Sequence, residues 1–214
     1  MYKLCDMKKL AIVFGGLVVL IFLSLFSCHK CGPFPNMYKT IGLYWHIAIA
    51  TYSEDSISWS ARWATPNDSI IYNEFSIEIE PIKETYYAQS FDEIKFDFVS
   101  SAYACDPALP QTDERIDSMV IVSSKDFNVI HVAGEDLSDL FDIIPVDFVN
   151  GLYRERFDLK EYISTNPTVP WRMFLILKEP PDLVSDYEFL VKYYQEGIDS
   201  NYFEFLTDKV VIIK

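Results

Sequence analysis

Glycine, histidine and basic residues are scarce in this chain, and these scarcities exclude whole classes of function. Of 214 residues only 7 are Gly and 3 are His, and 18 Lys and Arg stand against 32 Asp and Glu, for a formal net charge of −14. Beyond the apolar N-terminal segment no two glycines are close enough to form a phosphate-binding loop, so we expect no nucleotide. The negative charge repels phosphates, so we expect no nucleic acid partner.

The motifs of nucleophilic catalysis are missing as well. Neither Gly-x-Ser-x-Gly nor Ser-x-x-Lys occurs. His29, His46 and His131 are far apart in the sequence; we expect His46 on the outer face of a strand, and no particular serine is indicated as a triad partner for His131. The sequence therefore leaves enzyme activity open but favours a protein that is not an enzyme.

Clustered carboxylates suggest metal binding only weakly. Asp136, Asp139 and Asp142 recur every three residues, and oxygen-rich loops can hold Ca²⁺. The glycine that a calcium loop requires is absent from this stretch, so we interpret these aspartates as helix caps and solvated loop residues. We expect no metal and no cofactor.

The N-terminal stretch from Met7 to Cys28 carries the clearest signal in the chain. Lys8 and Lys9 precede an uncharged apolar run from Leu10 to Phe26, and the small residue Ser27 stands before Cys28. This order is typical of a secretory signal. Leu25 to Cys28 resembles the lipobox of a bacterial lipoprotein, which implies cleavage before Cys28 and attachment of a diacylglycerol (with palmitate-like chains) to its sulfur.

A membrane-spanning helix is the alternative for the same stretch. The apolar run is just under the ~18 residues at which a span becomes credible, and longer than most signal-peptide cores. Both interpretations place a folded domain on the outer side of a membrane. Because His29 rather than an aspartate follows Cys28, the resemblance to lipoproteins favours the outer membrane, with the periplasmic and surface faces both open.

Two cysteines remain once Cys5 has left with the signal and Cys28 is lipidated. Cys31 and Cys105 are an even pair in an oxidising compartment, which favours a disulfide. Such a bond would stabilise the domain by ~4 kcal/mol on the loop-entropy model. Two free cysteines are the alternative.

Period-two alternation of apolar and polar residues dominates the rest of the chain and predicts strands. We expect a hairpin of 57–64 and 71–79, in which Phe75, Ile77 and Ile79 point inward and Ser76, Glu78 and Glu80 point outward. We expect a central strand over 118–123 and short helical turns at 90–93, 137–141 and 158–163, the last opened by the capping box Asp158 to Glu161; the rest of 126–149 is expected to be loop. In the strand expected at 41–51, Ile41 points inward, and Tyr44 and His46 point outward. Further strands are predicted at 41–51, 94–105, 171–177, 187–194, 202–206 and 209–213. This pattern predicts a mainly β fold, an antiparallel β-sandwich of immunoglobulin-like texture with one or two short helices.

Trp59 and Trp63 lie on one face of a predicted strand, four residues apart in sequence, with Ala61 between them on that face. If exposed, they would stack on sugar rings or contact a partner protein. If buried, they would belong to the core, which their alternation with serines favours.

Several segments resemble an uncharacterised family of gut bacterial lipoproteins that contains a domain of unknown function. They are Ala102 to Pro107, Thr112 to Ser118, Asp126-Phe127 and Ala133 to Phe141. The resemblance spans most of the mature chain and is strongest between Ala102 and Phe141. It implies secretion, lipidation and a β-rich fold, and assigns no catalytic residue.

Together these observations predict a signal peptide (1–27), a tether (28–39) and a single β-sandwich domain (40–214). We expect a lipid-anchored protein of the cell envelope that binds a ligand or assembles with another envelope protein. An extracytoplasmic hydrolase and a glycan-binding module are the alternatives.

Overall fold

The computed structural model describes residues 37–53, 56–65, 68–87, 110–146, 155–199 and 201–214. Of residues 52, 53 and 56–61 the backbone alone is described. The chain divides into two compact units, residues 1–37 with 86–110 and residues 38–85 with 111–214, and nearly all the described residues belong to the second.

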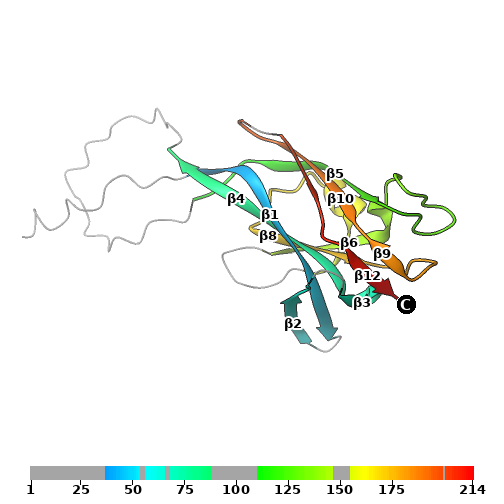
Figure 1. Cartoon of the computed structure of the whole chain (residues 1–214). Coiled ribbons are helices and arrows are strands. Elements are labelled where there is room, and N and C mark those ends of the chain that lie inside the picture. Colours follow the sequence, from blue (N-terminus) through cyan, green and yellow to red (C-terminus); the bar gives the residue numbers. More distant parts are fainter. Residues whose placement is uncertain (1–36, 54–55, 66–67, 88–109, 147–154, 200) are drawn as a thin grey trace, which may run out of the picture. The chain divides into compact units, whose positions relative to one another are not determined.

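The largest element of the second unit is a six-stranded sheet, in the order β2-β1-β4-β8-β6-β7 (Figure 1). Its strands are β1 (Met37–Ser53), β2 (Ser56–Trp63), β4 (Phe75–Tyr86), β6 (Phe141–Val146), β7 (Phe157–Asp158) and β8 (Arg172–Leu177). The predicted strand over 171–177 is confirmed as β8, and its position between β4 and β6 explains its fully apolar sequence, because both faces are covered.

Two three-stranded sheets complete the β structure. One has the order β11-β10-β5 and the other β3-β12-β9. Their strands are β3 (Ser69–Ile71), β5 (Arg115–Ser123), β9 (Ser185–Tyr187), β10 (Phe189–Glu196), β11 (Tyr202–Leu206) and β12 (Val210–Ile213). Apart from β3 and β12, which pair in parallel, the registers recorded between described strands are antiparallel. The mainly β, antiparallel fold is consistent with the predicted sandwich.

Helical structure in the described ranges is limited to short segments. Two are 3-10 turns, η2 (Tyr72–Glu74) and η3 (Ser138–Leu140), and one is an α-helix, α2 (Leu159–Ser164). The carboxylate of Asp158 accepts a hydrogen bond from the backbone N–H of Glu161 (3.0 Å) at the start of α2. The predicted N-terminal cap of this helix is thereby confirmed.

The main core lies on one face of the six-stranded sheet. Phe75, Ile77 and Ile79 of β4 are fully buried there, as the alternation predicted. They belong to the same cluster as Ile121 of β5 and Val191 of β10, so this face packs against the β11-β10-β5 sheet. A second, smaller cluster of Ile144, Phe174 and Ile176 lies on the opposite face, formed by the alternate residues of β6 and β8.

Several details of the predicted strand pattern are wrong. The segments 57–64 and 71–79 do not form a hairpin, because β1 lies between β2 and β4. The segment 118–123 is not a central strand, because β5 is an edge of its sheet within the described residues and its burial alternates. Part of the segment expected to be loop is β6, and Ile41, expected in the core, is 51% exposed. Alternation identifies the side on which a residue points, but neither its neighbouring strand nor what covers it.

Within the described ranges, no helix has the length and apolar character that crossing a bilayer requires. The predicted helical turn at 90–93 and the predicted strand at 94–105 lie outside the described residues.

Candidate functional site

An exposed row of rings lies on the outer face of the six-stranded sheet, opposite the main core. Trp63 of β2 pairs with Ala48 of β1, so it shares a face with the alternate β1 residues Tyr44 and His46. The side chains of Trp63 and Tyr44 are 65% and 64% exposed. We call Tyr44, His46 and Trp63 the aromatic row.

The indole of Trp63 is fixed by two contacts. The imidazole of His46 stacks on it, with ring centroids 4.5 Å apart and an interplanar angle of 22°. The indole Nε1–H donates a hydrogen bond to Oε2 of Glu78 on β4 (3.2 Å). Since His46 covers one face of a ring that remains mostly exposed, the opposite face of the indole is open to a ligand.

Two contacts hold β4 close to β1, so that Glu78 reaches Trp63 across β1. The hydroxyl of Ser76 donates to the carbonyl of Ala48 (3.0 Å), and Gly42 lies so close to Ile82 that an added Cβ would meet its Cδ1 at 3.2 Å. Ser76 and Ile82 lie on the face of β4 that carries Glu78. Glycine at position 42 permits this close approach.

A guanidinium group links two carboxylates beside the aromatic row. Arg172 of β8 contacts Oε1 of Glu78 (3.1 Å) through Nη1 and Oε2 of Glu80 (2.9 Å) through Nη2. Glu78 is 7% exposed, so its charge needs this partner. Arg172 and Glu80 remain partly accessible, so the guanidinium group can donate hydrogen bonds to a bound molecule and the carboxylate can accept them.

A lysine held on an aromatic ring lies farther along β4, at a position that alternates with Glu78 and Glu80. The ammonium group of Lys83 lies 3.4 Å from the ring centroid of Trp171 and 5.5 Å from that of Tyr38. It also donates a hydrogen bond to the backbone carbonyl of Trp171 (3.0 Å). Partial burial lowers the pKa of Lys83 to about 8, opposed by the charge of Glu80 and assisted by that of Arg172.

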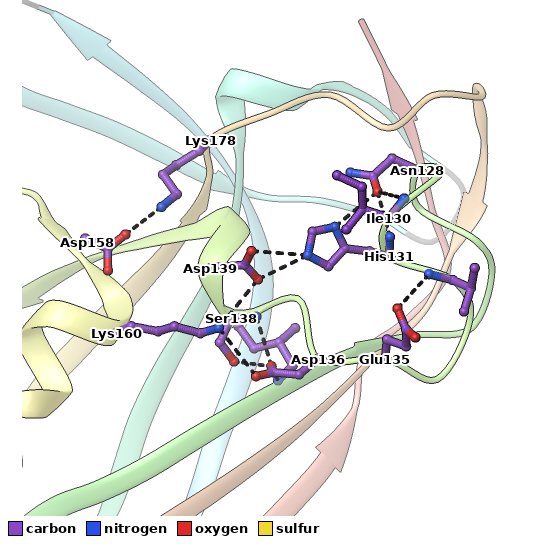
Figure 2. A network of polar contacts seen from close by, with 12 residues as sticks. Asn128, Ile130, His131, Glu135, Asp136, Ser138, Asp139, Asp158, Lys160 and Lys178 are labelled. Atoms are coloured by element: carbon purple, nitrogen blue, oxygen red, sulfur yellow. Dashed lines mark hydrogen bonds and ion pairs between the residues drawn. The ribbon is translucent and has the colours of Figure 1, made fainter.

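His131, the residue considered for a catalytic triad, lies in a separate network (Figure 2). Its Nδ1 is 3.1 Å from Oδ1 of Asn128, and its Nε2 is 3.2 Å from both carboxylate oxygens of Asp139. Burial disfavours the charge of Asp139, but its own backbone N–H, Lys160 and His131 outweigh that effect and lower the pKa of the carboxyl. The partners of His131 are therefore an amide and a carboxylate, neither of which is the serine that a triad requires.

Ser138 lies next to this network without joining it as a nucleophile. Its hydroxyl contacts the carboxylate of Asp136 and the backbone carbonyl of Met119 (2.9 Å), and the side chain is buried. Asp136 also accepts a hydrogen bond from the backbone N–H of Ser138 (2.9 Å), while the N-cap of η3 is Leu137, which makes no side-chain capping bond. The arrangement is that of a structural turn.

The remaining aspartates of the predicted oxygen-rich stretch are paired with cations. Asp142 contacts Arg156 (2.5 Å) and Lys178 (3.8 Å). Among the described residues no group of three or more His, Cys, Asp or Glu side chains is arranged to hold a metal ion. Asp139 lies in η3 and Asp142 in β6, so the interpretation of these aspartates as caps and solvated loop residues is wrong for Asp142, whose side chain is only 14% exposed.

The site residues predicted from the sequence have different outcomes. Cys28, Cys31 and Cys105 lie outside the described residues, as does the side chain of Trp59. Trp63 is exposed, so the expectation of a core tryptophan is wrong for this residue: β2 is the edge strand of its sheet, and the indole lies on the face away from the main core. His46 is exposed as expected.

The sequence analysis missed Glu78 and Arg172 as members of the site. Alternation had placed Glu78 on the outer face of its strand, but nothing in the sequence indicated that Arg172 lies beside it. Comparison with family models, curated proteins and solved structures finds no match for this chain. The resemblance to a family of gut bacterial lipoproteins stays a prediction.

Proposed function

We propose that this protein is a lipid-anchored component of the outer membrane that binds carbohydrate through the aromatic row. The single observation that carries the proposal is the exposed, fixed indole of Trp63, one face of which is open. Sugar rings present flat patches of C–H groups that stack on such a face, and a preorganised ring loses little entropy on binding.

The surroundings of Trp63 supply the polar contacts that a sugar needs. Glu80 and Arg172 are partly accessible and lie on the same sheet, so carboxylate acceptors and guanidinium donors are both available for hydroxyl groups. Tyr44 and His46 are two residues apart on β1, a spacing of about 6.8 Å that suits neighbouring sugar units in a chain. We infer a binding role rather than hydrolysis because the carboxylates of Glu78 and Glu80 are engaged with Arg172.

The charge balance favours uncharged sugars. Glu78 and Glu80 contribute two negative charges, only one of which Arg172 offsets. The whole chain carries a net charge of −14, which disfavours uronic acids and sulfated glycans.

Binding to a panel of neutral polysaccharides, measured by affinity electrophoresis and calorimetry, tests the proposal. We expect Trp63→Ala to weaken binding about tenfold, equivalent to ~1.4 kcal/mol. Tyr202→Ala is the matched control, because Tyr202 is an exposed aromatic residue (42%) on β11, in a different sheet. Absence of binding to every neutral polysaccharide, or equal binding by the Trp63 variant, would contradict the proposal.

The lipid anchor requires a separate experiment. The sequence from Met7 to Cys28 supports cleavage before Cys28 and its lipidation. We expect the intact mass of the membrane-extracted protein to show loss of residues 1–27 and addition of acyl chains, and we expect Cys28→Ala to abolish both changes. A mass that retains residues 1–27 would instead support the membrane-spanning helix.

A further inference from the structure

Two loops of the second unit expose large aliphatic side chains that neither the fold nor the aromatic row uses. Val129 and Ile130 are 90% and 73% exposed, and Leu183 and Val184 are 71% and 60% exposed. Val132 is also exposed. We call these five residues the apolar tip. Exposed aliphatic residues that gather in one place mark an interaction surface more often than scattered ones.

Hydrogen bonds join the two loops. The carboxylate of Asp182 accepts from the backbone N–H of Val129 (3.1 Å), and the N–H of Asp182 donates to the carbonyl of Phe127 (2.9 Å). Leu183 and Val184 follow directly in sequence, so they lie beside the 127–132 turn. In Figure 1 the green loop after β5 extends on the same side of the view as β9, which follows Val184.

The turn that presents Val129 and Ile130 is rigidly held. Oδ1 of Asn128 accepts hydrogen bonds from the backbone N–H groups of Ile130 (2.9 Å) and His131 (2.7 Å), and the ring of His131 lies between Asn128 and Asp139 (Figure 2). Below the turn, Phe127 is fully buried against Tyr187, with ring centroids 5.6 Å apart. A fixed turn loses little conformational entropy when its tip is bound.

The two loops that carry the apolar tip have an excess of negative charge. The basic residues of the segments 124–136 and 178–188 are paired, Lys125 with Asp186 and Lys178 with Asp158. Exposed acidic residues in the same segments are Asp126, Glu135, Asp136, Glu179 and Asp182. Only Asp136 among them contacts a lysine, Lys160, at 3.8 Å. An apolar centre with a charged rim is the usual anatomy of a protein interface.

We propose that the apolar tip inserts into an apolar pocket, ringed by Lys and Arg, on a partner protein. The acidic residues beside the tip favour such a partner over a lipid surface and over a second copy of this chain. An anionic lipid surface would be repelled by the rim, and two copies of this chain meeting at the tip would oppose like charges. That the partner is a protein of the cell envelope rests on the proposed lipid anchor. The binding of the tip to its partner does not depend on carbohydrate binding.

Site-specific photocrosslinking of the full chain, in the cells that produce it, tests this proposal. The photoreactive residue p-benzoylphenylalanine is placed at Val129, and the matched control carries it at Ile198, which is exposed (59%) and flanked by acidic residues in another turn. We expect one protein adduct at position 129, with a yield at least fivefold above that of the control. The crosslinked peptide of the partner should carry a net positive charge. Adding Ile130→Asp is expected to lower the yield at least fivefold.

The purified partner then allows the affinity to be measured. We expect Ile130→Asp to raise Kd at least tenfold, and we expect the combination of Asp126→Asn, Glu135→Gln and Asp182→Asn to weaken the salt dependence of binding while retaining hydrogen-bond acceptors. Carbohydrate binding by the Ile130 variant should stay unchanged, which separates a failure here from a failure of the aromatic row. Adducts only with lipid, with a second copy of this chain or with an acidic peptide would overturn the proposal, as would yields equal to those of the control.

Discussion

The ammonium group of Lys83 makes the free energy of unfolding depend on pH in a predictable direction. Its pKa falls from 10.5 to about 8 because partial burial disfavours the charged form. Between these two values the unfolded chain holds more protons than the folded protein, so stability rises as pH increases through this range. The full shift corresponds to about 2 kcal/mol between pH 7 and pH 9.5, and solvent screening of the half-exposed side chain reduces this to about 1 kcal/mol.

Urea unfolding of the purified protein at pH 7, 8.5 and 9.5, followed by tryptophan fluorescence, measures this rise. The comparison is with Lys83→Met, which keeps an aliphatic chain against Trp171 but cannot titrate. We expect the free energy of unfolding to rise by about 1 kcal/mol in the wild-type protein and not in the variant. At every pH the variant also lacks the hydrogen bond to the Trp171 carbonyl, so the comparison is of the pH dependence and not of the stability itself. Equal pH dependence in both proteins would refute the link between the burial of Lys83 and its pKa. Tyrosines and other lysines of the unfolded chain titrate mostly above this window.

Two further predictions concern the core and the only α-helix among the described elements. Phe189→Ala should lower the free energy of unfolding by about 3–5 kcal/mol, because the buried ring of Phe189 lies 5.3 Å from that of Phe75 and 6.0 Å from that of Phe141 (centroid distances). In the same urea titration, Phe157→Ala should lower it far less, because Phe157 is partly exposed. Asp158→Ala should cost about 1 kcal/mol at neutral pH through loss of the α2 cap. The hydrogen bonds from Lys178 and from the N–H of Glu161 lower the pKa of Asp158. The contribution of Asp158 to stability is therefore present above pH 3.8 and is lost as the pH falls through the lowered pKa. Thermal unfolding of the Asp158→Ala variant should be less sensitive to acid in that range than that of the wild-type protein.

Local patterns were sufficient to predict the elements whose signal is confined to neighbouring residues. The alternation of Phe75, Ile77 and Ile79 identified the buried side of β4, and the apolar run ending at Leu177 identified β8 as a covered strand. The spacing of Asp158 and Glu161 identified the start of α2. Each of these features depends on residues within one turn or one strand, where geometry follows directly from sequence spacing.

Pairing between distant segments was not predictable in the same way. A strand with one apolar face fits beside any other such strand, so alternation does not decide whether β2 pairs with β1 or with β4, and the predicted hairpin of β2 with β4 is wrong. The contact of Lys83 with the Trp171 carbonyl joins residues 88 apart in sequence. The exposure of Trp63 depends on β2 being an edge strand, which is a property of the whole sheet order. The candidate site is thus made by tertiary structure, whereas most of its individual residues had already been placed on strand faces.

The position of β12 between β3 and β9 also affects how the protein is made. This strand is the last of the described strands in sequence, yet it occupies the middle of its sheet and pairs with β3 over Ser69–Ile71, near the other end of the described chain. Ribosomal synthesis therefore leaves β3 and β9 without their shared neighbour until Val210–Ile213 has emerged. Such late closure of a long-range pair favours slow folding after synthesis, and it leaves the edges of two short strands open to chaperones until then.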